Sequence, residues 1–303
     1  MTLIISINGR ESIWLLADRR LSLGKRVVND DARKVMFLET VDGTAILGYA
    51  GLGATALGTQ PADWMSAVLR GRRNLSLEQS LGVLAEAMKK QFPPHMVRMP
   101  GRDGPRHNVL VTAFLGKEVR LYTFDLVFAP DRKGYWFRYT RHVAANPART
   151  PRIGLAGSGG AYMLHDKRWI RPLLRLLSAY DCGRVSSNVF ADHLAGLNDQ
   201  VHRVIGDNSV GPRCIVAWRN RGGGFHKGGG AHRFYSNKTR DANAPSLPTI
   251  ANGMDLSALI DVMMPYYKKT FETMGRGEVQ GESNDELDAQ VARIPDEPDE
   301  RLR

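Results

Sequence analysis

Residues 2–20, which read TLIISINGRESIWLLADRR, decide the fold of this chain. Residues 3–7 are apolar and mostly β-branched, and residues 12–17 are again mostly apolar, so each run predicts a strand. Asn8-Gly9, between the two runs, is a strong hairpin turn signal. The stretch therefore predicts an antiparallel β-hairpin at the start of the fold.

The register of this hairpin brings a hydroxyl group close to a carboxylate. If residues 8–11 form the loop, Ile7 opposes Ser12 and Thr2 lies opposite Ala17, beside Asp18. A further strand is predicted over residues 34–38, and it begins with a lysine. We therefore expect Thr2 and Asp18 to be neighbours, with Lys34 as a candidate cation.

A threonine that begins a chain has a chemistry of its own. If Met1 is removed, Thr2 carries a free α-amino group, whose ordinary pKa of about 8 leaves part of it neutral near pH 7. That amine can take the hydroxyl proton, while a nearby lysine stabilises the alkoxide and a carboxylate holds the lysine. Thr2, Asp18 and Lys34 are candidate catalytic residues, and the alternative is three ordinary residues at strand ends.

The periodicity of the rest of the chain predicts sheets flanked by helix pairs. Helical spacing is found over residues 54–69 and 77–92, and the second helix begins with a capping box, Ser76 and Gln79. Further strands are predicted over residues 44–49, 109–115, 119–124, 135–140, 153–156 and 213–218. A glycine-rich turn at 157–160 precedes predicted helices over 161–180 and 186–205. This order favours a sheet core between helices.

The pattern changes after residue 219. We expect residues 1–219 to form one domain and residues 220–303 to be an extension. The extension consists of a Gly-rich linker, one amphipathic helix over about 254–274, and an acidic tail that we expect to be disordered.

Composition limits the class of protein. Hydrophobic residues make up 43% and charged residues 24% of the 303 residues, which excludes a wholly disordered or fibrous chain. The net charge is +11, although residues 276–303 hold nine acidic and four basic side chains. The two cysteines have no zinc-type spacing, and the apolar start is too short for a signal peptide. We expect a cytoplasmic protein with no metal site and no membrane span.

Several short motifs, taken in order and spacing, resemble proteasome β subunits and the HslV-type bacterial peptidases. They are Thr2, Ala17-Asp18-Arg19-Arg20, Arg33-Lys34-Val35, Tyr49-Ala50-Gly51, Gly157-Ser158-Gly159-Gly160-Ala161-Tyr162 and Gly206-Asp207-Asn208-Ser209-Val210-Gly211. Those proteins are N-terminal-nucleophile (Ntn) hydrolases. The resemblance covers residues 2 to about 219 and implies an α+β fold, the four-layer αββα sandwich.

The resemblance also implies a role for each matching residue. Thr2 would be the nucleophile, with its own amine as the base, and Lys34 would tune the pKa values with Asp18 as its orienting anion. The remaining implied roles are an oxyanion hole at the Gly51 amide, Ser158 and Asp207 holding the amino group, and Arg20 bracing the site. The sequence departs from the family at Val210, where a serine is usual.

The implied function is a threonine peptidase subunit that cleaves polypeptides inside a self-compartmentalising homo-oligomeric ring. It would need no cofactor and would become active when Met1 is removed. An ATP-dependent unfoldase is a partner of the kind that such rings use, although nothing in the sequence names one.

Other interpretations stay open. An Ntn amidohydrolase acting on a small amide would need no ring, and a structural ring subunit would keep Met1 and have no activity. Residues 45–56 fit a strand and a GxGxxA turn, as in dinucleotide-binding proteins, but lack the acidic residue expected about 20 positions later. Arg168, Arg171 and Arg175 share one helical face that could meet phosphates or a partner subunit, and nucleic-acid binding is disfavoured because no recognised motif accompanies them.

Overall fold

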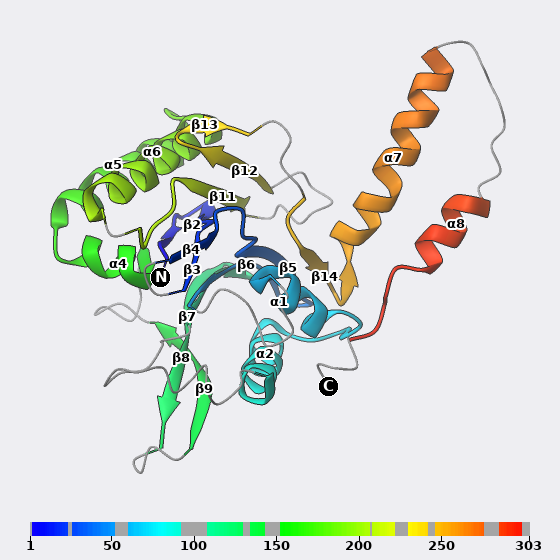
Figure 1. Cartoon of the computed structure of the whole chain (residues 1–303), viewed down its shortest axis with the longest axis horizontal. Helices are drawn as coiled ribbons and strands as arrows, with labels where there is room; N and C mark the ends of the chain where they lie inside the picture. Colours follow the sequence, from blue (N-terminus) through cyan, green and yellow to red (C-terminus); the bar gives the residue numbers. More distant parts are fainter. Residues whose placement is uncertain are drawn as a thin grey trace.

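The computed structural model describes ten stretches of the chain, and together they form a mixed α+β protein (Figure 1). The described residues are 2–23, 26–51, 60–91, 108–129, 134–142, 152–206, 208–221, 230–241, 246–275 and 285–298. The helices are α1 (Pro61–Leu69), α2 (Leu77–Gln91), α4 (Gly157–Leu164), α5 (Lys167–Asp181), α6 (Ser187–Ile205), α7 (Leu256–Gly275) and α8 (Asp285–Ala292). The strands are β1 (Ile4–Asn8), β2 (Ser12–Asp18), β3 (Leu21–Leu23), β4 (Arg26–Asn29), β5 (Val35–Glu39), β6 (Gly43–Ala50), β7 (Asn108–Leu115), β8 (Glu118–Phe128), β9 (Tyr135–His142), β10 (Ile153–Ala156), β11 (Arg213–Asn220), β12 (Gly230–Ser236), β13 (Thr239–Arg240), β14 (Thr249–Ala251) and β15 (Met254–Asp255).

A six-stranded sheet with the order β10-β1-β2-β11-β12-β13 contains the amino-terminal hairpin. The predicted hairpin is confirmed, but its predicted register is wrong by two residues, because Ile4 pairs with Ala17 and not with Leu15. A shift of two residues keeps every side chain on the same face of the sheet. The approach of Thr2 to Asp18 therefore survives the error.

The register error arises at the turn. Gly9 N donates to the Ser12 carbonyl oxygen at 2.8 Å, so the loop between the paired residues is Arg10 and Glu11 alone. A glycine at position 9 also permits close packing, since a Cβ atom there would lie 2.9 Å from a carboxylate oxygen of Asp181. The glycine that signals a turn in the sequence serves close packing in the structure.

A second sheet, of seven strands in the order β15-β14-β5-β6-β7-β8-β9, contains the strand that follows Lys34. Its neighbouring strands are antiparallel, except that β14 runs parallel to β5. A separate hairpin, β3 with β4, connects the two sheets along the chain and is not expected from the sequence pattern.

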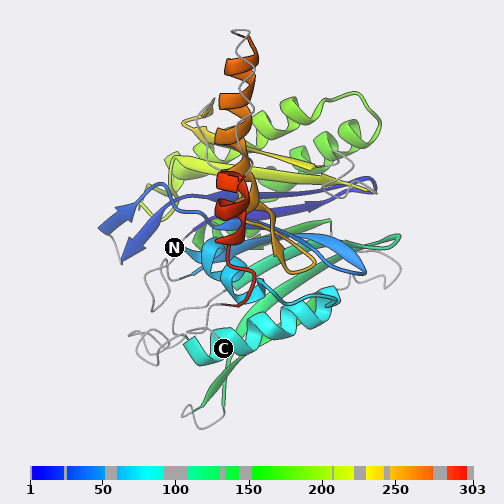
Figure 2. The same ribbon diagram turned by 90° about the vertical axis from the view of Figure 1, so that its right-hand side faces the viewer.

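Alternate residues of β1 face two different hydrophobic cores, as the pleat of a strand requires. Ile5 and Ile7 pack with residues of α4, α5 and α6, whereas Ile4 packs with Phe37 and other residues from both sheets. A third core lies between the second sheet and helices α1 and α2. The two sheets therefore pack on each other, with α4–α6 on one outer side and α1 and α2 on the other (Figure 2).

The helix boundaries are partly those expected. The predicted capping box is confirmed, because Gln79 N donates to Ser76 Oγ at 3.2 Å and Ser76 N donates to the Gln79 side chain at 2.8 Å. The single helix expected over residues 161–180 is wrong. Asp166 caps a new helix there by accepting from Arg168 N, and α4 already begins at the glycine-rich turn.

The structure also differs from the sequence interpretation after residue 219. Strand β12 pairs with β11 along seven residues, and β14 pairs with β5, so residues 230–255 add strands to both sheets. The predicted helix is present as α7, and the tail that was expected to be disordered contains α8. The sequence pattern does not indicate these strands, because glycine-rich runs flank them. Their stability comes from pairing with strands that are distant in the sequence. No helix in the described part of the chain is long and apolar enough to cross a bilayer.

Candidate active site

Thr2, Asp18 and Lys34 meet at the end of the first sheet where β1 begins. The Thr2 hydroxyl donates a hydrogen bond to Asp18 Oδ1 and accepts one from Lys34 Nζ. Lys34 Nζ lies 3.1 Å from the same carboxylate oxygen. All three residues are at least 98% buried. A hydroxyl, an ammonium and a carboxylate thus form one closed, desolvated cluster.

The Asp18 carboxylate is held by the backbone as well as by side chains. Oδ1 accepts from Leu3 N at 2.8 Å, and Oδ2 accepts from Arg20 N at 3.1 Å and Gly211 N at 3.0 Å. The carboxylate is therefore fixed from β1, from the end of β2 and from the turn before β11.

Lys34 is positioned by the residues that precede β5. Its Nζ also donates to the carbonyl oxygen of Arg20 at 2.6 Å, and its own carbonyl accepts from Tyr49 N at the end of β6. Burial lowers the pKa of Lys34, and the Asp18 charge opposes that shift. A lysine with a lowered pKa can exchange a proton nearer to neutral pH than an exposed lysine can.

The backbone of Thr2 is tied to the start of α4. Its carbonyl oxygen accepts from Gly159 N at 3.1 Å, and a longer contact of 3.5 Å reaches Ser158 Oγ. Gly157 has φ +78°, and a Cβ atom there would lie 2.2 Å from the Thr2 carbonyl oxygen. The first amides of a helix lack partners within the helix, so Thr2 supplies one of the missing acceptors.

Arg20 braces the cluster from outside. Its guanidinium pairs with both oxygens of Asp30, Nε to Oδ1 at 2.6 Å and Nη2 to Oδ2 at 2.9 Å. Nη1 reaches the carbonyl and side-chain oxygens of Asn208 at 3.3 and 3.4 Å. This bidentate bond raises the pKa of Arg20 and lowers the pKa of Asp30.

The other predicted residues are placed less directly. Gly51 follows β6, and among the contacts of the described residues none joins it to Thr2. Ser158 contacts the carbonyl of Thr2, and its predicted role at the amine stays a prediction. Asp207 lies outside the described residues. Val210, which replaces the expected serine, is 1% exposed and packs in the core under α6.

Three contributions to the site were missed in the sequence. The amides of Gly159 and Gly211 carry no side-chain signal, although both glycines stand in the motifs quoted above. Asp30 could have been noticed, because an adjacent pair of carboxylates, Asp30 and Asp31, immediately precedes the segment with Lys34.

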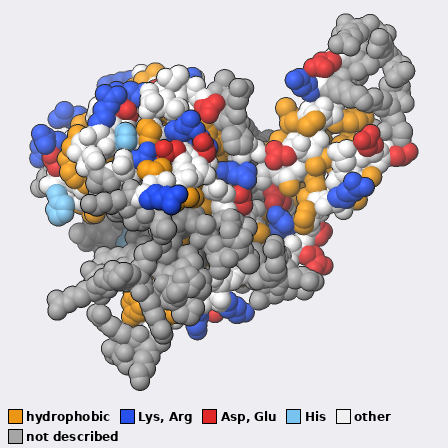
Figure 3. All heavy atoms as spheres, viewed as in Figure 1, with side chains coloured by type: hydrophobic (Ala, Val, Ile, Leu, Met, Phe, Trp, Pro, Cys, Tyr) orange, Lys and Arg blue, Asp and Glu red, His pale blue; other side chains and the backbone are white. Residues whose placement is uncertain are grey.

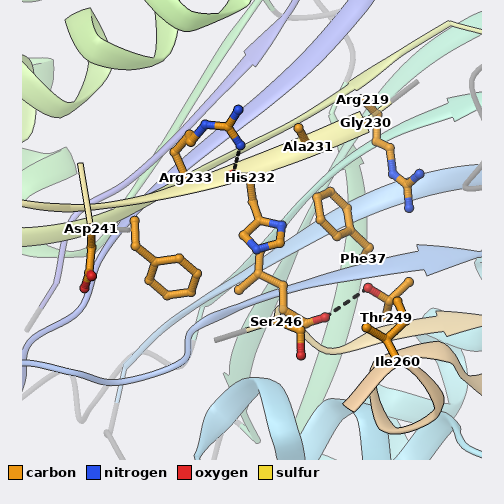
Figure 4. Close-up of a pocket in the computed structure, with 12 residues that line it drawn as sticks. Phe37, Arg219, Gly230, Ala231, His232, Arg233, Asp241, Ser246, Thr249 and Ile260 are labelled. Carbon is orange, nitrogen blue, oxygen red and sulfur yellow. Dashed lines mark hydrogen bonds between the residues drawn. The ribbon is translucent and has the colours of Figure 1, made fainter. Parts of the chain in front are cut away.

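A cavity of about 450 Å³ lies elsewhere, between β12 and the residues that lead into α7. Phe37, His232 and Ile260 contribute to its walls, and Arg219 lies beside Phe37 (Figure 4). Thr2, Asp18 and Lys34 do not line it. Within the described residues no group of three or more acidic, histidine or cysteine side chains is arranged to hold a metal ion.

The arrangement at Thr2 can favour an alkoxide, because a cation contacts the hydroxyl oxygen and a carboxylate accepts a hydrogen bond from the hydroxyl group. The basic residues Arg168, Arg171 and Arg175 are exposed on α5. Lys and Arg side chains lie on the visible surface of this part of the molecule (Figure 3). Neither a scan against protein-family models nor a search of curated proteins finds a match to this chain.

Proposed function

We propose that this chain is a threonine peptidase of the Ntn-hydrolase type, with Thr2 as the nucleophile once Met1 is removed. One observation carries the proposal: the buried contact of Thr2 Oγ1 with both Lys34 Nζ and Asp18. An ammonium that contacts the hydroxyl oxygen is already placed to stabilise the alkoxide that forms when the hydroxyl proton is taken. The packing of two sheets between two groups of helices supports a four-layer αββα sandwich as part of the same proposal.

The proposed reaction forms an ester on Thr2. The liberated amine of Thr2 takes the hydroxyl proton, and the oxygen attacks the scissile carbonyl carbon. Collapse of the tetrahedral intermediate breaks the C–N bond, and the departing amine receives that proton. Water then hydrolyses the ester and regenerates the hydroxyl. Lys34 stabilises the negative charge on the Thr2 oxygen, Asp18 holds Lys34, and the Gly51 amide is the proposed oxyanion donor.

We further propose a polypeptide substrate and a homo-oligomeric ring, as the resemblance implies, with an ATP-dependent unfoldase as the kind of partner that delivers substrates. A cytoplasmic location belongs to the same proposal. Cys182 and Cys214 are free thiols in the structure, as suits a reducing compartment. Native mass spectrometry separates the ring from a monomeric amidohydrolase acting on a small amide.

Intact-protein mass and covalent labelling test the proposed nucleophile. We expect the purified chain to lack Met1 and to gain one adduct from a β-lactone or peptide boronate probe. Thr2→Ala should lose the adduct, whereas Thr40→Ala, which removes a threonine hydroxyl far from the cluster, should keep it. Equal labelling of the wild type and Thr2→Ala would contradict the assignment. Retention of Met1 together with a lack of labelling would favour an inactive ring subunit.

A further inference from the structure

Asp30 lies just after β4, outside the cluster of Thr2, Asp18 and Lys34. It pairs with Arg20, whose backbone contacts both Asp18 and Lys34. Its carboxylate forms the bidentate pair with Arg20 described above. The Arg20 side chain is 8% exposed and that of Asp30 is 29% exposed. A planar guanidinium with a carboxylate on its fork is fixed in orientation as well as in position.

Arg20 connects Asp30 to both charged members of the cluster. Its backbone N donates to Asp18 at 3.1 Å, and its carbonyl accepts from Lys34 Nζ at 2.6 Å. A displacement of the Arg20 backbone therefore moves a hydrogen-bond donor to Asp18 and a hydrogen-bond acceptor of Lys34 together.

The same pair also fixes the turn at residues 208–211. Arg20 Nη1 contacts Asn208, and a Cβ atom on Gly211 would lie 2.7 Å from Arg20 Cβ and 3.2 Å from Asp30 Oδ1. The Gly211 amide in turn donates to Asp18. Asp30, Arg20 and this turn are thus packed into one unit around the carboxylate.

We propose that Asp30 is a positioning residue for the chemistry at Thr2, acting through Arg20 on the placement and charge of Lys34; this rests on the function proposed above. Lys34 experiences the charges of Asp18 on β2, Arg20 after β2 and Asp30 after β4, and the Thr2 amine would add a further one once it is released. Asp30 raises the pKa of Lys34, whereas Arg20 lowers it. Neutralising Asp30 therefore removes a favourable charge and leaves that of Arg20 uncompensated.

Asp31 provides a matched control for Asp30. It is the next residue and also an acid that pairs with arginine, Oδ2 with Arg213 Nη1 at 2.6 Å and Oδ1 with Arg19 Nη2 at 3.2 Å. It does not contact Arg20 in the described structure. Asp30→Asn and Asp31→Asn thus remove the same charge from the same loop, and only the first disconnects Arg20.

The test is the rate of Thr2 labelling by a β-lactone probe, measured from pH 6 to 10 on the full chain. We expect Asp30→Asn to label about tenfold or more slowly at neutral pH, because small displacements of reacting groups are costly. Its alkaline limb should lie at lower pH, since Lys34 loses its proton more easily. Asp31→Asn should match the wild type, and Asp30→Glu should restore the alkaline limb. A partly unfolded variant loses amplitude but keeps its pH midpoint, so the midpoint separates positioning from stability.

A wild-type rate and alkaline limb in Asp30→Asn would overturn the proposal, as would equal effects of Asp30→Asn and Asp31→Asn. A second readout needs no activity. The ¹³Cε signal of Lys34, assigned by its absence in Lys34→Met, should titrate at lower pH in Asp30→Asn than in the wild type. If the wild type is never labelled at Thr2, the proposed function fails, and this titration still decides whether Asp30 acts on Lys34.

Discussion

Two buried ion pairs, Lys34 with Asp18 and Arg219 with Glu39, show how differently the same charges can be used. Both cations are at least 98% buried, and each lies 3.1 Å from its carboxylate. The lysine also contacts a hydroxyl and a carbonyl, and backbone amides hold its carboxylate.

The guanidinium of Arg219 lies over the ring of Phe37 at 4.5 Å, and its Nε has no hydrogen-bond partner in the described structure. Burial lowers the pKa of both cations, but an arginine stays protonated at any pH of interest. The cation of the first pair is therefore one whose protonation can change with pH, whereas the cation of the second pair keeps its charge.

The largest effect that we expect is on the rate at which Thr2 is labelled, and only one of the two pairs should influence that rate. Lys34→Met should slow the labelling of Thr2 by about 10²- to 10³-fold, because it removes the cation that stabilises the alkoxide. Arg219→Met should leave labelling within about twofold. Lys34→Met removes the cation beside the buried Asp18 carboxylate and should lose about 3–5 kcal/mol of unfolding free energy, and Arg219→Met should lose less because Glu39 is 14% exposed. Labelling rates and urea unfolding check this, and a comparable loss of labelling in Arg219→Met would break the distinction.

The pH dependence of stability should also differ between the pairs. Because burial lowers the pKa of Lys34, the unfolded chain binds more protons than the folded chain between that lowered pKa and about 10.4. Lys34 therefore contributes stability that is fully present above pH 10.4 and is lost as pH falls through the folded pKa, by at most about 1.4 kcal/mol per pH unit. Unfolding at several pH values, in the wild type and in Lys34→Met, should show this slope in the wild type alone. Arg219→Met should keep the wild-type slope.

The smallest effect that we expect is a change in stability when the flat guanidinium of Arg219 is replaced by an ammonium group. Arg219→Lys keeps the charge near Glu39 but loses the flat contact with Phe37, so we expect a loss of about 1 kcal/mol with no change in Thr2 labelling. Thermal unfolding at fixed pH measures the loss. A variant as stable as the wild type would show that charge alone matters at this position.

Local signals predicted local structure well. The capping box of Ser76 and Gln79 could be predicted because both partners lie within one turn of the same helix. The hairpin of β1 and β2 was predicted, but its register was not, because Asn8 and Gly9 belong to the paired ends of the strands and only Arg10 and Glu11 form the loop. The start of α4 was read as a turn, since the contact that favours a helix there comes from Thr2, more than 150 residues away.

The residues of the candidate site also differ in whether the sequence could predict them. The type and spacing of Thr2, Asp18 and Lys34, together with the family resemblance, were sufficient to place them in one site. The contributions of Asp30 and Gly211 could not be predicted, because they depend on the direction of a guanidinium and of one backbone amide. Both directions are set by how loops from separate parts of the chain pack together.

The bond between the Thr2 carbonyl and the first turn of α4 has a consequence for the proposed removal of Met1. Chain ends usually fray unless something ties them down. Here the carbonyl of residue 2 is held by a helix, its hydroxyl by two charged groups, and the next amide by Asp18. An aminopeptidase that excises the initiator residue would therefore expose a new terminus that stays in register with the sheet.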